Sequence, residues 1–543
     1  MFFTQRARRI FRRARLAFGL AALAASLGCS PHEPAADLTI INDLEPESLD
    51  PAIITAQADM RIVAGMFEGL TRQEPVVGRA EPGLAERWEI SPDATLYTFH
   101  LRTHLQWSTG EPITSADVVY SWLRTLNPAT ASDYAGQLYY VTNAEAFNTG
   151  KLTNAALVGV QATDPYTVRV QLNHPTPFFL DICAMPLACV TPRQTIEKYG
   201  DHWLSARPLP VSGAYELVAW RLNDKVRLKK NPRYWDAAHT QSELIDLLPI
   251  GAPNTALSLY DRGQADLVWD KELIPTELMD VLLHRPDFHP FSFLGTYFVR
   301  FNVTRKPFDD ARVRRALALA VDKRRIVTKI TRAGEQPTSH LVPPGTANYV
   351  SPEGLGYDPA AARQLLAAAG FPGGQGFPRF EYLFNAGAGG LKLHEDIAVE
   401  LQQMWRQELG INMELRSVEP QVFWGMLSHL DFTLAKSSWI GDYNDANTFL
   451  GMFLTGDGNN ETGWSHPRFD QLVHQANATV DMAAREKMFQ NAETILIRDE
   501  VPVIPIYIYT GINYFDTNRV TGIWQNVLDA HPLRCLRKIP RGP

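Results

Sequence analysis

Strand-like and helix-like patterns alternate along most of the chain, and this alternation constrains its fold more than any other feature. Residues 97–102 and 166–172 alternate apolar and polar side chains, which is typical of half-buried strands. Asp358 can cap the start of a helix that Gly370 ends. One apolar helix face follows the spacing i, i+4, i+7, i+8 through Ile397, Leu401, Met404 and Trp405. Strands that alternate with helices over such a length predict an α/β fold.

The first 28 residues have the layout of an export signal. They contain six Arg and no acidic residue, and an apolar run over 16–27 follows. This run is too short to span a bilayer, which takes about 20 apolar residues. We therefore predict a signal peptide at 1–28, for either the general or the twin-arginine route, and a tether at 29–36. Cys29 follows Ser26-Leu27-Gly28, which resembles the lipidation motif of bacterial lipoproteins; the alternative is plain cleavage near this point.

Composition narrows the class of protein further. The chain has 543 residues, enough for two to four domains, and a formal charge of −7 that becomes more negative once the signal is removed. Without residues 1–28 the chain is acidic and has no basic stretch, so it is a poor candidate for binding nucleic acid. The chain after residue 28 contains no apolar stretch long enough to span a bilayer. Cys183 and Cys189, six positions apart, either close a small disulfide in an oxidising compartment or remain buried thiols.

A search for catalytic motifs returns little. The sequence contains no G-x-S-x-G elbow, no H-E-x-x-H pair and no Walker A loop. It also contains no C-x-x-C pair, and its His residues are scattered, so neither a metal nor a cofactor is predicted. These observations predict no catalytic residue. The absence of local motifs does not exclude a hydrolase whose catalytic residues are dispersed along the chain.

Four blocks in one collinear order carry a resemblance to a known family. They are residues 47–51 with 67–70, residues 84–118, residues 210–215 with 231–235, and residues 302–323. From Leu38 to the C-terminus the chain thereby resembles the peptide-binding members of the large solute-binding proteins of ABC importers.

This resemblance implies two lobes that are joined by a hinge and close on a ligand, with an extra domain in the first lobe. The implied first domain is discontinuous, over 37–67, 192–293 and 510–543, the extra domain covers 68–191, and the far lobe covers 294–509. The implied function is to enclose oligopeptides and to deliver them to an inner-membrane ABC permease. Such a protein is exported to the periplasmic space as a monomer, touches the membrane only through a lipid on Cys29, and is not an enzyme.

The resemblance also implies site residues. The family places a carboxylate for the peptide amino group in a Trp-x-x-Asp-Tyr-Asn motif, which matches residues 439–444 and assigns that role to Asp442. By the same comparison the peptide carboxylate meets Lys436 and His394. Aromatic side chains are then expected to line the cleft at Tyr134, Trp439, Tyr443 and Tyr509. Structural roles for these side chains, in a core or at the surface, are the alternatives.

The sequence departs from the family at the carboxyl end of the ligand. Lys436 stands where the family has an Arg, and a second Arg of the family matches Leu427. An acidic partner of the first Arg matches Thr55. Lys436 keeps the positive charge but lacks the bidentate guanidinium of Arg. We therefore expect that the preferred peptide length differs from that of the family, or that the ligand is a modified or murein-derived peptide. Two rival hypotheses are an exported peptide-processing enzyme and a relative that binds nickel, haem or a sugar-containing ligand.

Overall fold

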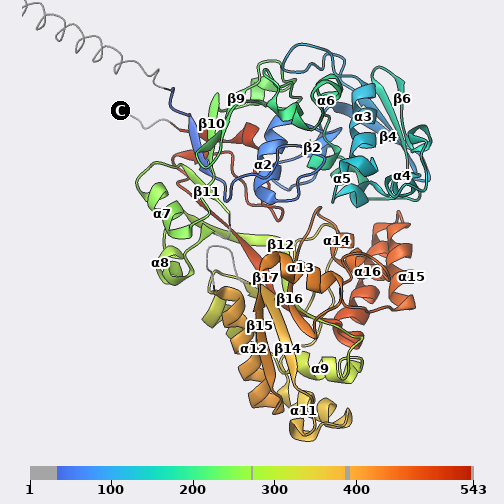
Figure 1. The fold of residues 1–543 in the computed structure, drawn as a ribbon, viewed down its shortest axis with the longest axis vertical. Coiled ribbons are helices and arrows are strands. Elements are labelled where there is room, and N and C mark those ends of the chain that lie inside the picture. The colour runs from blue at the N-terminus through green and yellow to red at the C-terminus, as the bar shows by residue number, and fades with distance from the viewer. Residues whose placement is uncertain (1–32, 271–272, 386–391, 540–543) are drawn as a thin grey trace, which may run out of the picture.

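The computed structural model describes residues 33–270, 273–385 and 392–539, and it has two lobes (Figure 1). An eleven-stranded mixed sheet runs through both lobes in the order β15-β14-β16-β12-β17-β11-β1-β10-β9-β8, and β13 pairs with β17 beside it. The predicted α/β class and two-lobed architecture are thereby confirmed. Cys29 and the predicted signal at 1–28 lie outside the described residues.

The first lobe contains one end of the large sheet and a separate small sheet. Its share of the large sheet comprises β1 (Leu38–Ile41), β8 (Tyr215–Arg221), β9 (Lys225–Lys230), β10 (Leu244–Leu248) and β11 (Leu267–Trp269). The helices beside these strands are α2 (Gln57–Met66), α6 (Arg193–Tyr199), α7 (Pro253–Asp261) and α8 (Met279–Leu282). The short strands β18 (Val520–Thr521) and β19 (Arg537–Lys538) pair near the end of the chain.

The small sheet forms the outer part of the first lobe. Its strands are β4 (Ala85–Ile90), β5 (Leu96–Leu101), β7 (Thr167–Gln171) and β6 (Val160–Asp164), in that spatial order. The nearby helices and strands are α3 (Ser115–Thr125), α4 (Ala144–Asn148), α5 (Phe179–Ile182), β2 (Thr71–Gln73) and β3 (Ala80–Pro82). β5 alternates half-buried and buried residues, as the pattern at 97–102 predicts. We call residues 68–191 the small-sheet unit.

The far lobe contains the other end of the large sheet with its helices. Its strands are β14 (Phe380–Asn385), β15 (Met413–Val418), β16 (Leu434–Ile440) and β13 (Gln336–Pro337). Its helices are α9 (Ala311–Leu319), α10 (Lys323–Ile326), α11 (Pro359–Ala368), α12 (Leu393–Leu409), α13 (Pro420–Ser428), α14 (Asn447–Leu450), α15 (Pro467–Asn477) and α16 (Met482–Thr494). The α12 face predicted from sequence is buried, and the side chain of Asp358 caps α11 by accepting the Ala361 amide. β14 and β16 are parallel, so their carboxyl ends share one edge, where solute sites of α/β sheets form.

Two long antiparallel strands connect the lobes. β12 (Phe288–Phe301) and β17 (Val503–Phe515) pair along most of their length, with β11 beside one end of β17 and β16 beside the other end of β12. The pairing loses its regular register between the pair Ser292–Thr510 and the pair Thr296–Ile508. Ladder hydrogen bonds are interrupted at such an irregularity, and the strands bend there more easily than in a regular ladder.

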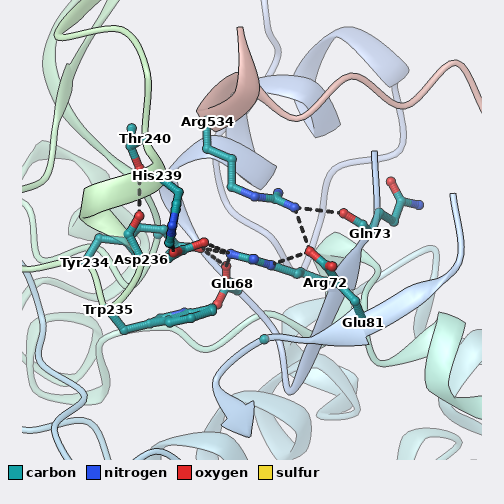
Figure 2. Close-up of polar contacts among 12 residues, drawn as sticks. Glu68, Arg72, Gln73, Glu81, Tyr234, Trp235, Asp236, His239, Thr240 and Arg534 are labelled. Carbon is teal, nitrogen blue, oxygen red and sulfur yellow. Dashed lines mark hydrogen bonds and ion pairs between the residues drawn. The ribbon is translucent and has the colours of Figure 1, made fainter. Parts of the chain in front are cut away.

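A buried charged network fixes the small-sheet unit to the rest of the first lobe (Figure 2). Arg72 donates from Nε to Glu81 Oε1 at 2.8 Å and from Nη1 to Asp236 Oδ2 at 2.8 Å. Glu68 accepts hydrogen bonds from the hydroxyl of Tyr234 and, at 2.6 Å, from the indole nitrogen of Trp235. Two of the blocks that resemble the family, 67–70 and 231–235, therefore meet in this network. These two blocks thereby join the small-sheet unit to the rest of the first lobe.

Candidate functional site

A cavity of about 590 Å³ lies between the lobes. The segment 439–442, which runs on from β16, forms its far-lobe wall, and the opposite wall comes from the first lobe. Its lining residues include Arg61, Tyr134, Asp270, Trp439, Asp442 and Asp529. A chamber between two lobes that share hinge strands can enclose a small solute completely, which an open surface groove cannot do.

Asp442 presents a carboxylate to this cavity. Its position depends on Gly441, whose amide donates to the carbonyl oxygen of Leu294 at 2.7 Å. A Cβ at Gly441 would lie 2.6 Å from Leu294 Cδ2, so a larger residue here would have to displace the Leu294 side chain. The Asp442 amide then donates to Thr448 Oγ1 at 3.2 Å, which fixes the turn after the strand.

Two donors of the small-sheet unit reach the Asp442 carboxylate from the opposite lobe. Gln137 Nε2 donates to Oδ2 at 3.1 Å, and the Tyr134 hydroxyl also hydrogen-bonds to this carboxylate. Burial raises the pKa of Asp442 to about 6, although both hydrogen bonds act to lower it. Burial, with the adjacent carboxylate as the lesser cause, raises the pKa of Tyr134. Asp442 is therefore a carboxylate whose charge is only partly compensated.

The first-lobe wall of the cavity contains charged side chains that sequence reasoning missed. Arg61 donates from Nη1 to the carbonyl oxygen of Trp269 at 2.6 Å and lies 3.2 Å from Asp270 Oδ2 and 3.5 Å from Asp529 Oδ2. Asp529 Oδ1 also lies 2.9 Å from His531 Nε2. These residues come from distant parts of the chain, and no local motif links them.

Lys436 and His394 lie near enough to interact electrostatically, but they are not among the described residues that line the cavity. Lys436, in β16, is buried, donates from Nζ to Asn385 Oδ1 at 3.1 Å and lies 5.5 Å from the centre of the Phe423 ring. His394 is in the first turn of α12. Burial, and secondarily the Lys436 charge, lower the pKa of His394 to about 3, so at neutral pH it is an uncharged imidazole.

The four aromatic side chains occupy different surroundings. Tyr134 and Trp439 line the cavity, whereas Tyr443 and Tyr509 are not among its described lining residues. Tyr509 packs edge-on against Tyr507, with 5.3 Å between ring centres. Tyr443 is buried, and its ring stacks on Phe178 of the small-sheet unit with 4.6 Å between centres.

Other features bear on the predicted chemistry. Cys183 and Cys189 are free thiols that are both buried, which answers the question left by their spacing. In the part of the chain that the structure describes, no cluster of three or more His, Cys, Asp or Glu could hold a metal ion. None of the described helices has the length and apolar character needed to cross a membrane.

Two lobes that share hinge strands and face each other across a cavity define the class of bilobal solute-binding proteins. Residues 79–461 match the model of the bacterial extracellular solute-binding proteins, family 5 (middle region), and the chain belongs to this family.

Three similar proteins show the range of ligands named among the relatives. The periplasmic oligopeptide-binding protein OppA of Salmonella typhimurium is 34% identical over 480 residues, which cover 87% of this chain and 86% of OppA. The probable deoxycholate-binding periplasmic protein YgiS of Escherichia coli is 33% identical, with 86% of each chain covered. The solved structure of the Escherichia coli murein tripeptide-binding protein MppA superposes with a TM-score of 0.80 at 30% identity, covering 94% of this chain and 99% of MppA.

Proposed function

We propose that this protein captures oligopeptides between its lobes and delivers them to an ABC permease in the inner membrane. The observation that carries this proposal is the Asp442 carboxylate in the wall of the inter-lobe cavity. A carboxylate in a partly dry chamber pairs well with a peptide ammonium, because a charge-assisted hydrogen bond is stronger there than in bulk water. The relative named OppA, similar over most of its length, supports peptides as the ligand class.

The peptide is held at both ends. Its amino group pairs with Asp442, and its carboxylate meets Lys436, with His394 as a neutral hydrogen-bond donor. Tyr134, Trp439 and Tyr509 supply aromatic surface between these ends. Asp442 follows Lys436 by six positions along the chain, which corresponds to at most about 20 Å. An extended peptide of about three to five residues spans that distance once the reach of the lysine side chain is subtracted.

Closure occurs at the irregular stretch of β12 and β17. The domain junctions expected at 293/294 and 509/510 fall between the pairs Ser292–Thr510 and Thr296–Ile508, where the regular register is lost. Residues 37–67, 192–293 and 510–543 then form the first domain, 68–191 the extra domain and 294–509 the closing lobe. The network around Arg72 supports a first lobe that moves as one body.

The protein acts outside the cytoplasm and does not transform its ligand. Residues 1–28 direct export, Cys29 carries the lipid that tethers the mature chain, and the protein works as a monomer. A fluorescent peptide incubated with the protein should be recovered uncleaved. Replacement of Cys29 by Ser should move the protein from the membrane fraction to the soluble fraction, and a variant that stays in the membrane fraction would contradict the anchor.

The decisive experiment is to compare ligands that differ only at the amino end. Calorimetric titration with a free tetrapeptide should give binding, whereas the same tetrapeptide acetylated at its amino end should bind about 100-fold more weakly. Deoxycholate, a steroid acid without an ammonium, is the matched non-peptide ligand. Tighter binding of deoxycholate than of any free peptide would overturn the proposal. A mass spectrum of the ligand that co-purifies with the protein distinguishes ordinary from murein-derived peptides.

A further inference from the structure

The contact between Phe178 and Tyr443 crosses from one lobe to the other. Phe178 precedes α5 in the small-sheet unit, and Tyr443 follows Asp442 in the far lobe. Their rings are nearly parallel, with 6° between the planes and 4.6 Å between the centres. The exposed fractions are 2% for Phe178 and 4% for Tyr443, so each ring removes the other from water. Tyr443 thus belongs to the apolar core of the small-sheet unit, although it is attached to the far lobe.

Polar groups support the same contact on both sides. Asn447 of the far lobe donates from Nδ2 to the hydroxyl of Tyr140 in the small-sheet unit at 3.1 Å and to that of Tyr443 at 2.9 Å. The Tyr140 ring meets Phe178 edge-on, with 5.2 Å between the centres. The hydroxyl of Tyr443 is therefore satisfied while its ring is buried, as a stable buried tyrosine requires.

A buried ion pair shapes the far-lobe side. Arg485 of α16 donates from both terminal nitrogens to Asp445, each at 2.7 Å, and its guanidinium lies 5.8 Å from the centre of the Phe178 ring. A bidentate pair of this kind holds the guanidinium in one orientation. Phe178 therefore lies in a far-lobe socket formed by the Tyr443 ring and the Arg485 guanidinium.

We propose that Phe178 and this socket form a clasp that holds the lobes together without a ligand and so sets the fraction of ligand-free protein that is closed. Opening of the lobes must expose both rings and break the Tyr140–Asn447 hydrogen bond, whereas closure restores them. Tyr443 then acts on binding by positioning the lobes and does not touch the ligand. Its neighbour Asp442 faces the cavity, so one short segment carries both the amine anchor and the clasp. The effect on peptide affinity rests on the proposed function, but the clasp itself does not.

The clasp predicts a uniform effect on affinity. When a ligand binds only the closed form, its apparent Kd is the intrinsic Kd divided by the closed fraction. Phe178→Ala should therefore raise the Kd about tenfold for every peptide that binds, and the ratio between two peptides should stay as in the wild type. A residue that contacted the ligand would change that ratio.

Small-angle X-ray scattering of the ligand-free protein tests the clasp without any peptide. The wild type should give the profile of the closed structure, and Phe178→Ala a larger radius of gyration. Tyr140→Phe, which keeps the ring but removes the hydroxyl that accepts from Asn447, should shift the radius in the same direction by less. Tyr166→Ala, which removes an aromatic ring 44% exposed in the same unit, is the matched control and should change nothing.

Two results would overturn the clasp. One is a ligand-free wild type as open as Phe178→Ala, and the other is a change in the ratio of two peptide affinities in that variant. If Phe178→Ala fails to fold, Tyr140→Phe decides: an unchanged radius also overturns the clasp. A wild type that is closed but binds no peptide would leave the clasp standing and remove the proposed function instead.

Discussion

Gln137 Nε2 donates a hydrogen bond to Asp442 Oδ2 at 3.1 Å, although 305 positions separate the two residues. This bond joins the small-sheet unit to the far lobe at the carboxylate that we assign to the ligand ammonium. The Tyr134 hydroxyl reaches the same carboxylate. The proposed anchor thus accepts hydrogen bonds from the lobe opposite the one that carries it.

Replacement of Asp442 by Asn should weaken peptide binding but stabilise the ligand-free protein. Peptide affinity should fall about 100-fold, because an amide cannot pair with an ammonium as a carboxylate does. The ligand-free protein should become more stable at pH 7 by at most about 2 kcal/mol, since burial of the Asp442 charge opposes folding and the side chain keeps some exposure. Calorimetric titration and thermal unfolding measure the two effects. Asp431→Asn, at an exposed position of the same lobe, is the control and should alter neither; a destabilised Asp442→Asn would refute the assigned cost.

Peptide affinity should depend on pH through Asp442. Burial raises its pKa to about 6, so the ligand-free protein increasingly holds Asp442 protonated below that pH. A protonated carboxyl has to lose its proton before it pairs with an ammonium. The Kd should therefore be constant above about pH 7 and should rise by up to about tenfold per unit well below pH 6. His394 titrates near 3 and does not contribute in this range.

Titrations between pH 4.5 and 8 measure this dependence. Asp59, which also lines the cavity, has a pKa raised to about 6 by burial. The titrations are therefore repeated with the Asp442→Asn variant, so that the two carboxyls can be distinguished. In Asp442→Asn the residual affinity should be almost independent of pH. A pH dependence that survives in this variant would move the assignment to Asp59 or to Glu68, another cavity-lining carboxyl whose pKa is raised by burial.

Lys436 should recognise the peptide carboxylate and nothing else on the ligand. Lys436→Met should weaken a free peptide about tenfold, or roughly 1.4 kcal/mol. The same peptide with an amidated carboxyl end should bind wild type and variant equally, because it offers no charge to Lys436. Lys487→Met, at an exposed position on α16, controls for the loss of one positive charge. An amidated peptide that is weakened as much as the free one would show that Lys436 has a structural role only.

Arg72, which also lines the cavity, should matter for stability. It is the cation between Glu68, Glu81 and Asp236, and Arg534 is a second cation at Glu81. Arg72→Met should lower the free energy of unfolding by about 3 kcal/mol, since buried carboxylates lose their partner. Without the cation the carboxyl pKa values rise, so the deficit should shrink as pH falls. Thermal unfolding at pH 7 and pH 5 tests this. Arg87→Met, from an exposed pair with Glu89, should be neutral; an equal loss in both variants would argue against the network.

Sequence alone determined the elements and the family. The alternating residues at 97–102 and the regularly spaced apolar residues of α12 predict a strand and a helix from local sequence alone. This works because a strand or a helix buries one face wherever it packs. The segment 439–444 was also recognisable, because it matches the Trp-x-x-Asp-Tyr-Asn motif of the family.

Only the tertiary structure decided what these elements face. It brought Gln137 to Asp442 and Phe178 to Tyr443, and it placed Lys436 and His394 outside the described lining of the cavity that contains Asp442. It also joined Arg61, Asp270 and Asp529 into one wall. Such contacts depend on the path of the chain through two lobes and on the angle at which the lobes meet, and no local periodicity carries that information.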